Sequence, residues 1–543
     1  MGRELLERLC IEGTLTAQTP LHVGGYGDHV DTDLPLARNG DGVVYIPGTS
    51  LAGVLRAWCA QALGEDRTRK LWGFQPATRS ENATGAEVTG WASAIWVDDA
   101  PVALPEGALM EIRDGVGIDR VTSAAATAIK YDRAVLPRGT RLTLSLTVEI
   151  EATPRLPKPE IEAIIGHLLR AMSDRPFHLG AARTRGLGRV TFDLSKLQRQ
   201  PLMSRAGMLN WLLGGDADTV SVEALIGAET AVTLSPQPGL EIDVVWEPVG
   251  PLMVQAGYEG MGVDILPLMS AGPNGLTLVL PGSSVKGALR SQAERIVRTL
   301  LGRSASRAPQ AGKRFLEQLD DLPLIGEIFG GRAQAQAPGG DGAAVRPGRG
   351  ALAVADCYAE AGISPALWRR VVMPDAEPNP DAMQQDLVQA LSEIDAATES
   401  QLQFEEAHHV AIDRWTGGAA EGMLYNVLIP TQVVWQALHL SLDVQRLPAR
   451  LRLPGLALLL LTLRDLMQNR IPLGFATHRG MGEIRVTHLC LVGRDLQDSD
   501  LVDLTDMTLQ DEALGDLPPA LRERLTEAWQ GWLDAAAAPG GDA

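Results

Sequence analysis

The sequence predicts an α+β protein built from two tandem copies of one ferredoxin-like domain. Three groups of residues in the first half return in the same order in the second half: Ile46–Arg56 as Leu280–Arg290, Ile118–Thr122 as Ile412–Thr416, and Leu179–Gly188 as Leu473–Gly482. The last two pairs keep one offset, since 412 − 118 = 294 and 473 − 179 = 294. A shared offset across unlike motifs indicates a duplicated domain.

Each copy repeats one order of expected elements. The opening strand covers residues 9–17 in the first copy and 241–247 in the second. It is followed in each copy by a helix (51–63 and 285–301), a strand (92–98 and 351–356), an alternating strand (142–148 and 438–444), a second helix (159–172 and 456–467) and a last strand (188–192 and 482–486). The alternating strands place an apolar residue at every second position, which indicates one buried face. This order is that of a ferredoxin-like or RNA-recognition-type sandwich.

The spacing of the motifs predicts the domain division. The first two motifs are 118 − 46 = 72 positions apart in the first copy and 412 − 280 = 132 apart in the second, so the second copy carries an insertion. We expect a first domain at 1–195, a connector at 196–238, a second domain at 239–495 with an insertion at about 302–406, and an acidic tail at 496–543. The tail ends in a helix with one apolar face, which we expect to pack on its own protein, a partner surface being the alternative.

Composition limits the possible functions. The 543 residues are 45% hydrophobic and carry a net charge of −19, which argues against binding a polyanion through overall electrostatics. Local placement stays open, because several arginines lie inside the repeated motifs and guanidinium groups suit phosphates. The four cysteines lack metal-ligand spacing and predict a reduced, cytoplasmic protein. No secretory signal pattern opens the chain, and the most apolar stretch, 456–463, is too short to cross a bilayer.

Three repeated loops carry the candidate phosphate-binding chemistry. Hydroxyl groups at a helix start, with free backbone N–H groups, favour an anion site; these residues are Thr49 and Ser50, and Ser283 and Ser284, followed by Arg56, Lys286 and Arg290. Glycines interleaved with basic residues let a backbone approach phosphates; these are Gly180, Arg183, Arg185 and Gly186, and Gly474, His478, Arg479 and Gly480. The third loop is a protruding Asp-Arg segment, Asp119-Arg120 and Asp413-Arg414. The alternatives are an ordinary capped helix, a turn before a strand, and an ion pair that holds a turn.

Together these motifs resemble the RAMP superfamily, the backbone subunits of type III (Csm/Cmr-like) CRISPR effector complexes. Two such domains in one chain resemble the tandem fusions of type III-D variants. The resemblance implies that each domain is a palm that grips guide RNA (crRNA), with a hairpin thumb in the Asp-Arg segment. The implied partners are crRNA, single-stranded target RNA and other CRISPR effector subunits, with no membrane. The first copy departs from the family pattern at Ala52 and Ser123, and the second at Met253 and Glu483.

The resemblance also implies a catalytic aspartate in the loop between the first strand and the first motif. There it directs cleavage of target RNA with Mg²⁺ (or Mn²⁺), while the flipped nucleotide supplies its own 2′-hydroxyl as nucleophile. The second copy offers Asp264; alignment on its Leu-Pro-Leu sequence places Asp264 opposite Thr32, between Asp31 and Asp33. We prefer Asp33, hold Asp31 second, and expect Asp33 and Asp264 to be the metal ligands. The alternative is that a loop aspartate caps a turn.

Three function classes follow. The first is a guide-binding backbone subunit that also cuts target RNA. The second is the same scaffold without chemistry. The third is a metal-independent guide-processing endoribonuclease, which needs a paired His with Tyr or Lys near the glycine-rich loop. His178 and His478 lie there at non-equivalent positions, so this class ranks last.

Overall fold

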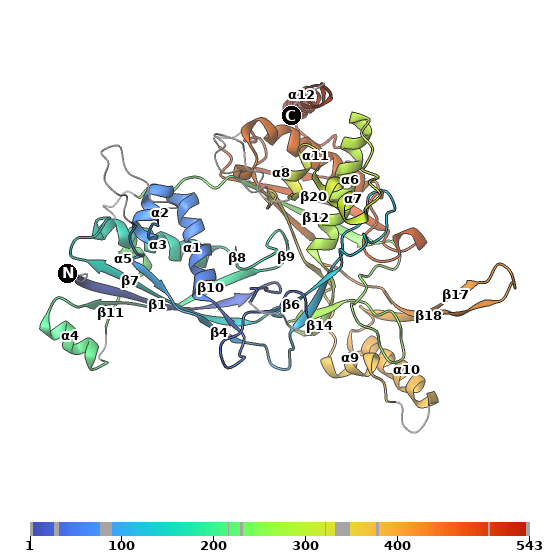
Figure 1. The fold of residues 1–543 in the computed structure, drawn as a ribbon, viewed down its shortest axis with the longest axis horizontal. Helices are drawn as coiled ribbons and strands as arrows, with labels where there is room; N and C mark the ends of the chain where they lie inside the picture. The colour runs from blue at the N-terminus through green and yellow to red at the C-terminus, as the bar shows by residue number, and fades with distance from the viewer. Residues whose placement is uncertain are drawn as a thin grey trace.

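The two halves of the chain fold into two α+β domains that pack against each other (Figure 1). The structure is a computed structural model that describes residues 4–25, 32–75, 90–214, 217–227, 232–320, 322–331, 348–375, 380–497 and 500–538. The first domain occupies the left of Figure 1 and the second the right, with the hairpin β17–β18 reaching away from both.

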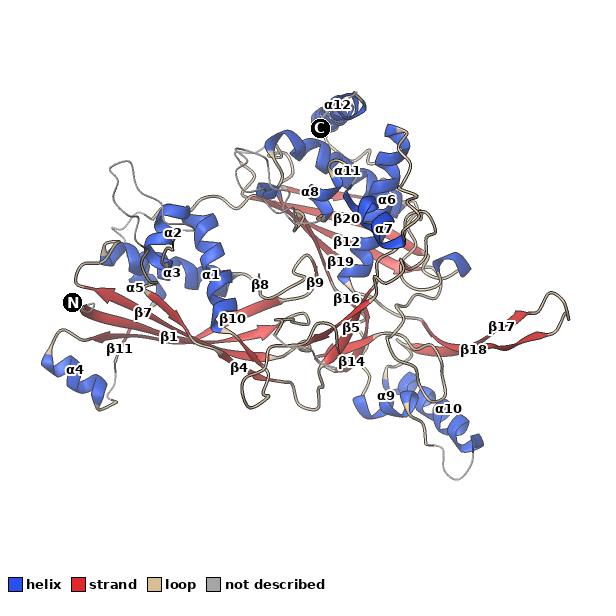
Figure 2. Cartoon of the chain, viewed as in Figure 1, coloured by secondary structure: helices blue, strands red, loops and turns tan. Residues whose placement is uncertain are grey.

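The first domain is a sheet with helices α1, α2 and α3 on one face (Figure 2). Its strands run in the order β11-β10-β1-β7-β4-β2, with β3 also paired to β7 and β8 to β10. β1, β7 and β10 pair antiparallel at its centre, as the predicted order requires. The elements are β1 (Leu5–Ala17), β2 (Tyr45–Ile46), α1 (Gly48–Leu63), α2 (Glu65–Trp72), β3 (Ile95–Val97), β4 (Ala100–Ala103), β7 (Arg141–Glu151), α3 (Lys158–Asp174), β8 (Phe177–His178), β10 (Arg189–Pro201) and β11 (Asp218–Thr219).

The second domain repeats this arrangement. Its sheet has the order β21-β20-β12-β19-β15-β9. The elements are β12 (Gly239–Pro248), β13 (Met269–Gly272), β14 (Gly275–Leu280), α6 (Gly282–Leu301), α7 (Ala311–Asp320), α8 (Ile325–Phe329), β15 (Leu352–Ala355), β16 (Cys357–Tyr358), α9 (Pro365–Val372), α10 (Pro380–Ala397), β19 (Leu438–Asp443), η1 (Val444–Arg446), α11 (Ala449–Met467), η2 (Thr477–Arg479), β20 (Ile484–Arg494), β21 (Asp506–Leu509) and α12 (Pro519–Ala537). The predicted fold class, two tandem ferredoxin-like domains, is therefore confirmed.

Alternation in the sequence explains which face of each sheet is buried. Leu142, Leu144, Leu146 and Val148 of β7 are all at most 3% exposed, as the period of two predicts. Some boundaries differ from the prediction: β10, for example, continues to Pro201, where the sequence predicted an end at residue 192. Helix α11 begins at Ala449 and continues through Pro454, whereas the sequence predicted a start at residue 456. Leu451 in its first turn is buried in the core, so tertiary packing outweighs the proline that would normally end a helix there.

The connector includes the short helices α4 (Arg205–Leu212) and α5 (Val222–Ile226). The extra length of the second copy is divided rather than continuous: α7 precedes β15, and α9 and α10 follow β16. The predicted insertion at about 302–406 lies partly outside the described residues, at 321, 332–347 and 376–379. In the tail, β21 extends the second sheet and α12 packs on α11 and α6. Leu521 and Leu525 of α12 are at most 5% exposed, so this face packs on its own protein as expected.

Each domain carries a two-stranded thumb hairpin, but the two hairpins have different surroundings. The first, β5 (Glu111–Gly115) with β6 (Tyr131–Val135), lies against the second domain. The second, β17 (Gln403–Ile412) with β18 (Ala419–Thr431), projects freely at the right of Figure 1. Trp415 at its turn is 96% exposed.

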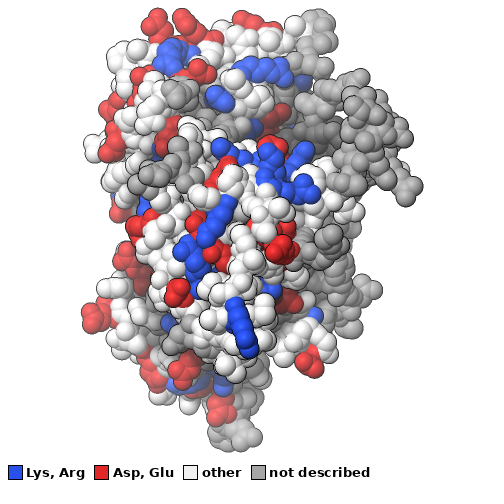
Figure 3. Space-filling view, turned by 90° about the vertical axis from the view of Figure 1, so that its left-hand side faces the viewer, with Lys and Arg blue, Asp and Glu red and all other residues white. Residues whose placement is uncertain are grey.

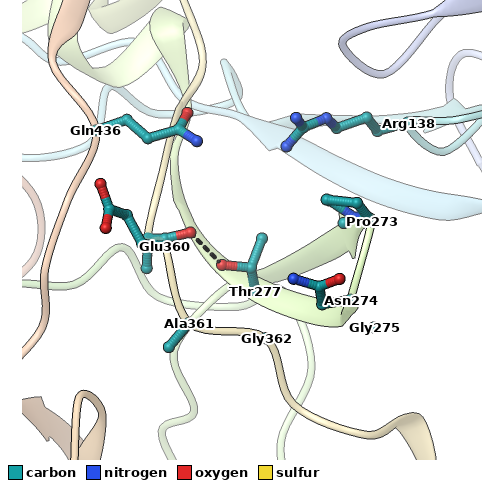
Figure 4. A pocket seen from close by; sticks show the side chains of 11 residues that line it. Arg138, Pro273, Asn274, Gly275, Thr277, Glu360, Ala361, Gly362 and Gln436 are labelled. Carbon is teal, nitrogen blue, oxygen red and sulfur yellow. Dashed lines mark hydrogen bonds between the residues drawn. The ribbon is translucent and has the colours of Figure 1, made fainter. Parts of the chain in front are cut away.

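The junction between the domains is held by main-chain and ionic contacts. The short strand β9 (Arg185–Gly186), from the glycine-rich loop of the first domain, pairs in parallel with β15 and so becomes the edge of the second sheet. At the first thumb, Glu111 accepts a hydrogen bond from the Ala271 N–H at 2.8 Å. A cavity of about 50 Å³ also lies here, with Arg138 from the first domain and Glu360 and Gln436 from the second around it (Figure 4). It has room for a water molecule or two and not for a nucleotide.

Candidate nucleic-acid interface

The candidate catalytic aspartates occupy matching positions in the two domains. The Asp33 N–H donates to Asp132 Oδ1 at 2.7 Å, and the Asp132 N–H donates back to Asp33 Oδ2 at 3.0 Å. In the second domain, the Asp264 N–H donates to Asn426 Oδ1 at 2.7 Å, and the Asn426 N–H donates back to Asp264 Oδ2 at 2.9 Å. Both aspartates are exposed at the base of a thumb.

This geometry makes Asp33 the counterpart of Asp264. Leu34 forms an isolated parallel β-bridge with Arg133, and Ile265 forms the same kind of β-bridge with Val427. The acidic loop therefore has the same register against the thumb in both copies. The sequence alignment that placed Asp264 opposite Thr32 was therefore off by one residue. Asp31 lies outside the described residues, and a catalytic role for either aspartate stays a prediction.

A Tyr-Arg pair lies beside the aspartate in each copy. The first glycine-rich loop places Arg185 Nη1 3.2 Å from Tyr131 Oη, and the second places Arg479 Nη1 2.5 Å from Tyr425 Oη. Both pairs keep the repeat offset, because 425 − 131 = 294 and 479 − 185 = 294. Each pair links the glycine-rich loop to the base of its thumb, next to the acidic loop.

Sequence reasoning missed Tyr131, Asp132, Tyr425 and Asn426. The signal was present in the same offset, since Tyr131-Asp132 and Tyr425-Asn426 are 294 positions apart. Where the first copy has the carboxylate of Asp132, the second copy has the amide of Asn426. Asn426 Nδ2 instead donates to Glu406 Oε1 at 2.6 Å, which brings a different carboxylate near Asp264.

The helix starts differ from the predicted anion sites. The Gly48 N–H of α1 donates to Asp99 Oδ1 at 2.7 Å, and the Gly282 N–H of α6 donates to Asp356 Oδ1 at 2.8 Å. A carboxylate of the protein thus already occupies each positive helix end. Thr49 and Ser283 are exposed, Ser50 and Ser284 are half-buried, and none of the four side chains caps its helix.

The arginines of these helices also have internal partners. Arg56 Nη1 donates to the Gly73 carbonyl at 3.2 Å, which follows α2. Arg290 Nη1 donates to the Gly330 carbonyl at 2.8 Å, and Arg290 Nε lies 2.7 Å from Glu294 Oε1. Both arginines therefore donate to carbonyls at the ends of later helices, α2 for Arg56 and α8 for Arg290, and a phosphate contact of either stays a prediction.

Lys286 is buried beside the domain junction. Its ammonium donates to the Leu352 carbonyl at 2.5 Å. Burial, followed by the positive charges of Arg185, Arg290 and Arg349, lowers the pKa of Lys286 to about 7. At neutral pH this side chain is therefore only partly charged.

The lowered pKa of Lys286 predicts a specific pH dependence of stability. The unfolded chain holds this proton up to the ordinary pKa of a lysine, whereas the folded chain releases it near pH 7, so the free energy of unfolding should rise with pH between about 7 and 10. We expect the unfolding temperature of the wild type to gain at least about 2 °C relative to Lys286→Met across this range. Thermal melts of both proteins at several pH values measure the difference. A constant difference would contradict the assignment.

The Asp-Arg segments form the same turn but meet different surroundings. Asp119 Oδ1 accepts the N–H groups of Val121 and Thr122, and Asp413 Oδ1 accepts those of Trp415 and Thr416. The aspartates therefore hold the turn, which was the alternative to RNA contact.

The first Asp-Arg segment also binds the second domain. Arg120 Nε lies 2.6 Å from Glu294 Oε2, and Arg314 Nε lies 2.6 Å from Asp119 Oδ2. Asp119 and Arg120 thus join the domains instead of facing solvent, a role that the sequence did not predict. Arg414 makes no ion pair among the described residues.

The glycines of the loops serve close main-chain approach within the protein. Gly180 has φ +81°, and a Cβ there would lie 2.2 Å from the His22 carbonyl oxygen; Gly474 has φ +87° and the same relation to Met253. At Gly186 a Cβ would lie 1.8 Å from Asp356 Oδ1, because this loop is docked on the second domain. Its counterpart Gly480, where 480 − 186 = 294, faces open space.

Positive side chains gather locally in spite of the net charge of −19. On the face drawn in Figure 3, Lys and Arg side chains gather in an oblique run through the middle, with several Asp and Glu among them and others at the margins. Within the described residues, no group of three or more His, Cys, Asp or Glu side chains is placed to hold a metal ion. None of the described helices is both long and apolar enough to span a membrane. The four cysteines are free, as predicted.

The fold and these loops define a protein with two RNA-recognition-type palms, each with a thumb. The sequence model of the RAMP superfamily matches residues 14–191 and 266–485, so each match covers most of one domain. The chain belongs to the RAMP superfamily. No curated protein matches the sequence. Membership implies a CRISPR-associated role in binding RNA, in proteins that work in multi-subunit complexes.

Proposed function

We propose that this chain is a guide-binding backbone subunit of a type III CRISPR RNA-targeting complex, in which both domains grip one crRNA strand. The observation that carries the proposal is a constellation found once in each domain: a loop aspartate, a tyrosine at the thumb base, and an arginine of the glycine-rich loop. Two copies of one arrangement in a single chain suit a strand with a repeating sugar-phosphate backbone.

The glycine-rich loop and thumb of the second domain are less covered by the rest of the protein than those of the first domain. Arg479 is held between Phe475, whose ring centroid lies 5.3 Å from its guanidinium carbon, and the Tyr425 hydroxyl. The hairpin beyond it presents Trp415, and exposed aromatic side chains provide stacking surfaces for bases. Because Gly480 faces open space where Gly186 is docked, we also propose that another domain of this class docks on the second glycine-rich loop.

We propose in addition that the loop aspartates cut target RNA with Mg²⁺. Asp33 and Asp264 each use Oδ2 for a main-chain hydrogen bond, and Oδ1 of each has no hydrogen-bond partner among the described residues. Mg²⁺ commonly binds one or two carboxylates together with water and substrate phosphate, which fits this donor set when RNA is present. The ion would polarise the scissile phosphate. The aspartates would orient it at the thumb base, and Asp132 adds a second carboxylate in the first domain alone.

The non-catalytic scaffold is the second candidate, since the hydrogen bonds of Asp33 and Asp264 also hold their loops. The guide-processing reaction has less support. His178 is half-buried, and burial with the nearby positive charges of Arg189 and Arg183 lowers its pKa to about 4, so it is not placed as a proton donor at neutral pH.

Binding of single-stranded RNA tests the proposed function. Arg479→Gln should weaken binding about tenfold at 0.1 M salt. It should also reduce the slope of log affinity against log salt concentration by about 0.7 for each lost phosphate contact. Tyr425→Phe should weaken binding only about threefold and leave the salt dependence of the affinity unchanged. Arg479 keeps its charge in this variant and loses only the hydrogen bond to the Tyr425 hydroxyl that positions it. Fluorescence anisotropy over a salt series measures both. Arg485→Gln is the matched control, since Arg485 is 65% exposed and pairs with Glu247; equal losses in all three variants would argue against the assignment.

A further inference from the structure

Arginines from three separate segments lie at the junction between the domains, where Thr184, the residue after Arg183, accepts a main-chain hydrogen bond from the Val354 N–H at 3.3 Å. Arg183 comes from the glycine-rich loop of the first domain, Arg349 precedes β15, and Arg446 ends η1 after β19. Arg446 Nη2 donates to the Arg349 carbonyl at 2.9 Å, which places these two side by side. Arg349 and Arg446 lie outside the repeated motifs.

Among the described residues, one carboxylate, that of Asp443, acts on two of the three arginines, Arg349 and Arg446. Asp443 Oδ2 lies 3.3 Å from Arg349 Nη2, and this is the only ion pair that any of the three makes in the described part of the chain. Arg183 makes none there. Burial, then Arg349 and Arg446, lowers the pKa of Arg183, and burial, then Arg349, lowers that of Arg446. Partly buried like charges oppose folding unless something negative joins them.

The positive charges of the cluster also lower the pKa values of two neighbouring groups. Arg349 contributes to the lowered pKa of both Lys286 and His178, and Arg183 and Arg189 contribute to that of His178. A further acid near His178, Glu241, already has partners: His439 Nε2 lies 3.2 Å from it and Arg494 also pairs with it. The cluster is thus a cationic site formed only when the two domains are docked.

We propose that Arg183, Arg349 and Arg446 form one phosphate site at the domain junction, and that it takes a backbone phosphate of the single-stranded RNA. This inference rests on the proposed function. The site is continuous with the strand path, because Arg183 is two residues from Arg185, which reaches Tyr131 at the base of the first thumb. The strand therefore crosses the junction on arginines from both domains, and binding it couples the domains together.

Arg183→Gln gives the sharpest test. It should weaken binding of single-stranded RNA about tenfold at 0.1 M salt and reduce the slope of log affinity against log salt by about 0.7. Removing the repulsion should also raise the unfolding temperature of the free chain, whereas a purely structural arginine would lower it. Arg349→Gln should reduce the salt slope equally, and the double variant should lose less than the product of the two single effects, because both arginines serve one phosphate. Arg522→Gln, on the exposed outer side of α12, is the control that should change neither property.

The outcomes separate the two proposals. If the wild type binds no RNA, the proposed function is overturned. If the wild type binds RNA and Arg183→Gln binds with the same affinity and slope, the junction site is overturned and the proposed function stands. Inorganic phosphate distinguishes a free-phosphate site from an RNA site. If millimolar phosphate stabilises the wild type as strongly as RNA does, and Arg183→Gln binds RNA with unchanged affinity, the cluster binds free phosphate. That result would contradict the proposal.

Discussion

Replacing both Asp33 and Asp264 by asparagine should abolish cleavage of guide-paired target RNA by the assembled complex, with a loss of at least about 100-fold. The asparagine variants retain an oxygen that can accept the N–H groups of Asp132 and Asn426, so the loops keep their hydrogen bonds while losing the charge that would hold a metal ion. Each single variant should remove cleavage beside one thumb only. Electrophoresis of end-labelled target RNA resolves the separate cuts.

The controls divide the function classes. Asp218→Asn, an exposed acid on β11, should leave every cut unchanged. EDTA should stop cleavage in the wild type, and metal-independent guide processing would continue in its presence. Normal cleavage by the double variant, with the acids of the other subunits removed, would show that this chain is a scaffold without nuclease chemistry. RNA binding should survive in all of these variants.

Glu294→Gln should have the largest effect on stability, a loss of about 3 kcal/mol. Glu294 is 1% exposed and accepts from two arginines, Arg120 of the first thumb and Arg290 of α6. Removing its charge leaves two neighbouring guanidinium groups buried without a counter-charge. Because Arg120 belongs to the first domain, the first thumb should also release from α6 before either domain unfolds.

Chemical denaturation measures the stability loss, and hydrogen exchange of residues 118–124 measures the release of the thumb. Glu247→Gln is the matched control: Glu247 and Arg485 are 62% and 65% exposed, and breaking such a pair should cost at most about 1 kcal/mol. Equal losses in the two variants would show that Glu294 is not central to the junction.

The sequence contained enough to predict the duplicated fold, because each copy repeats short-range signals. Apolar alternation in β7 and β19, together with a Pro-Gly turn before α1 and α6, depends only on neighbours along the chain. The offset of 294 then connected the two copies. Applied beyond the motifs, the same offset also points to Tyr131 and Tyr425.

The partners of the site residues depended on contacts between distant segments, which the sequence did not reveal. Asp356 accepts from the Gly282 N–H across 74 positions, and Arg120 meets Glu294 across 174. These contacts give several predicted RNA ligands partners within the protein, and their contact with RNA stays a prediction. The position of Asp33 was likewise fixed by the bridge between Leu34 and Arg133, a main-chain register that the Leu-Pro-Leu alignment could not show.

Equilibrium binding of single-stranded RNA by the purified chain, measured over a salt series, tests most directly whether this acidic protein holds a ribose-phosphate strand across both domains. The account predicts binding whose logarithm falls with log salt by a slope of about −2 or steeper, as contact with three or more phosphates requires. Arg183→Gln and Arg479→Gln, one in each domain's glycine-rich loop, should each make that slope shallower. Absence of binding at 0.05 M salt, or a slope that neither variant changes, would contradict it.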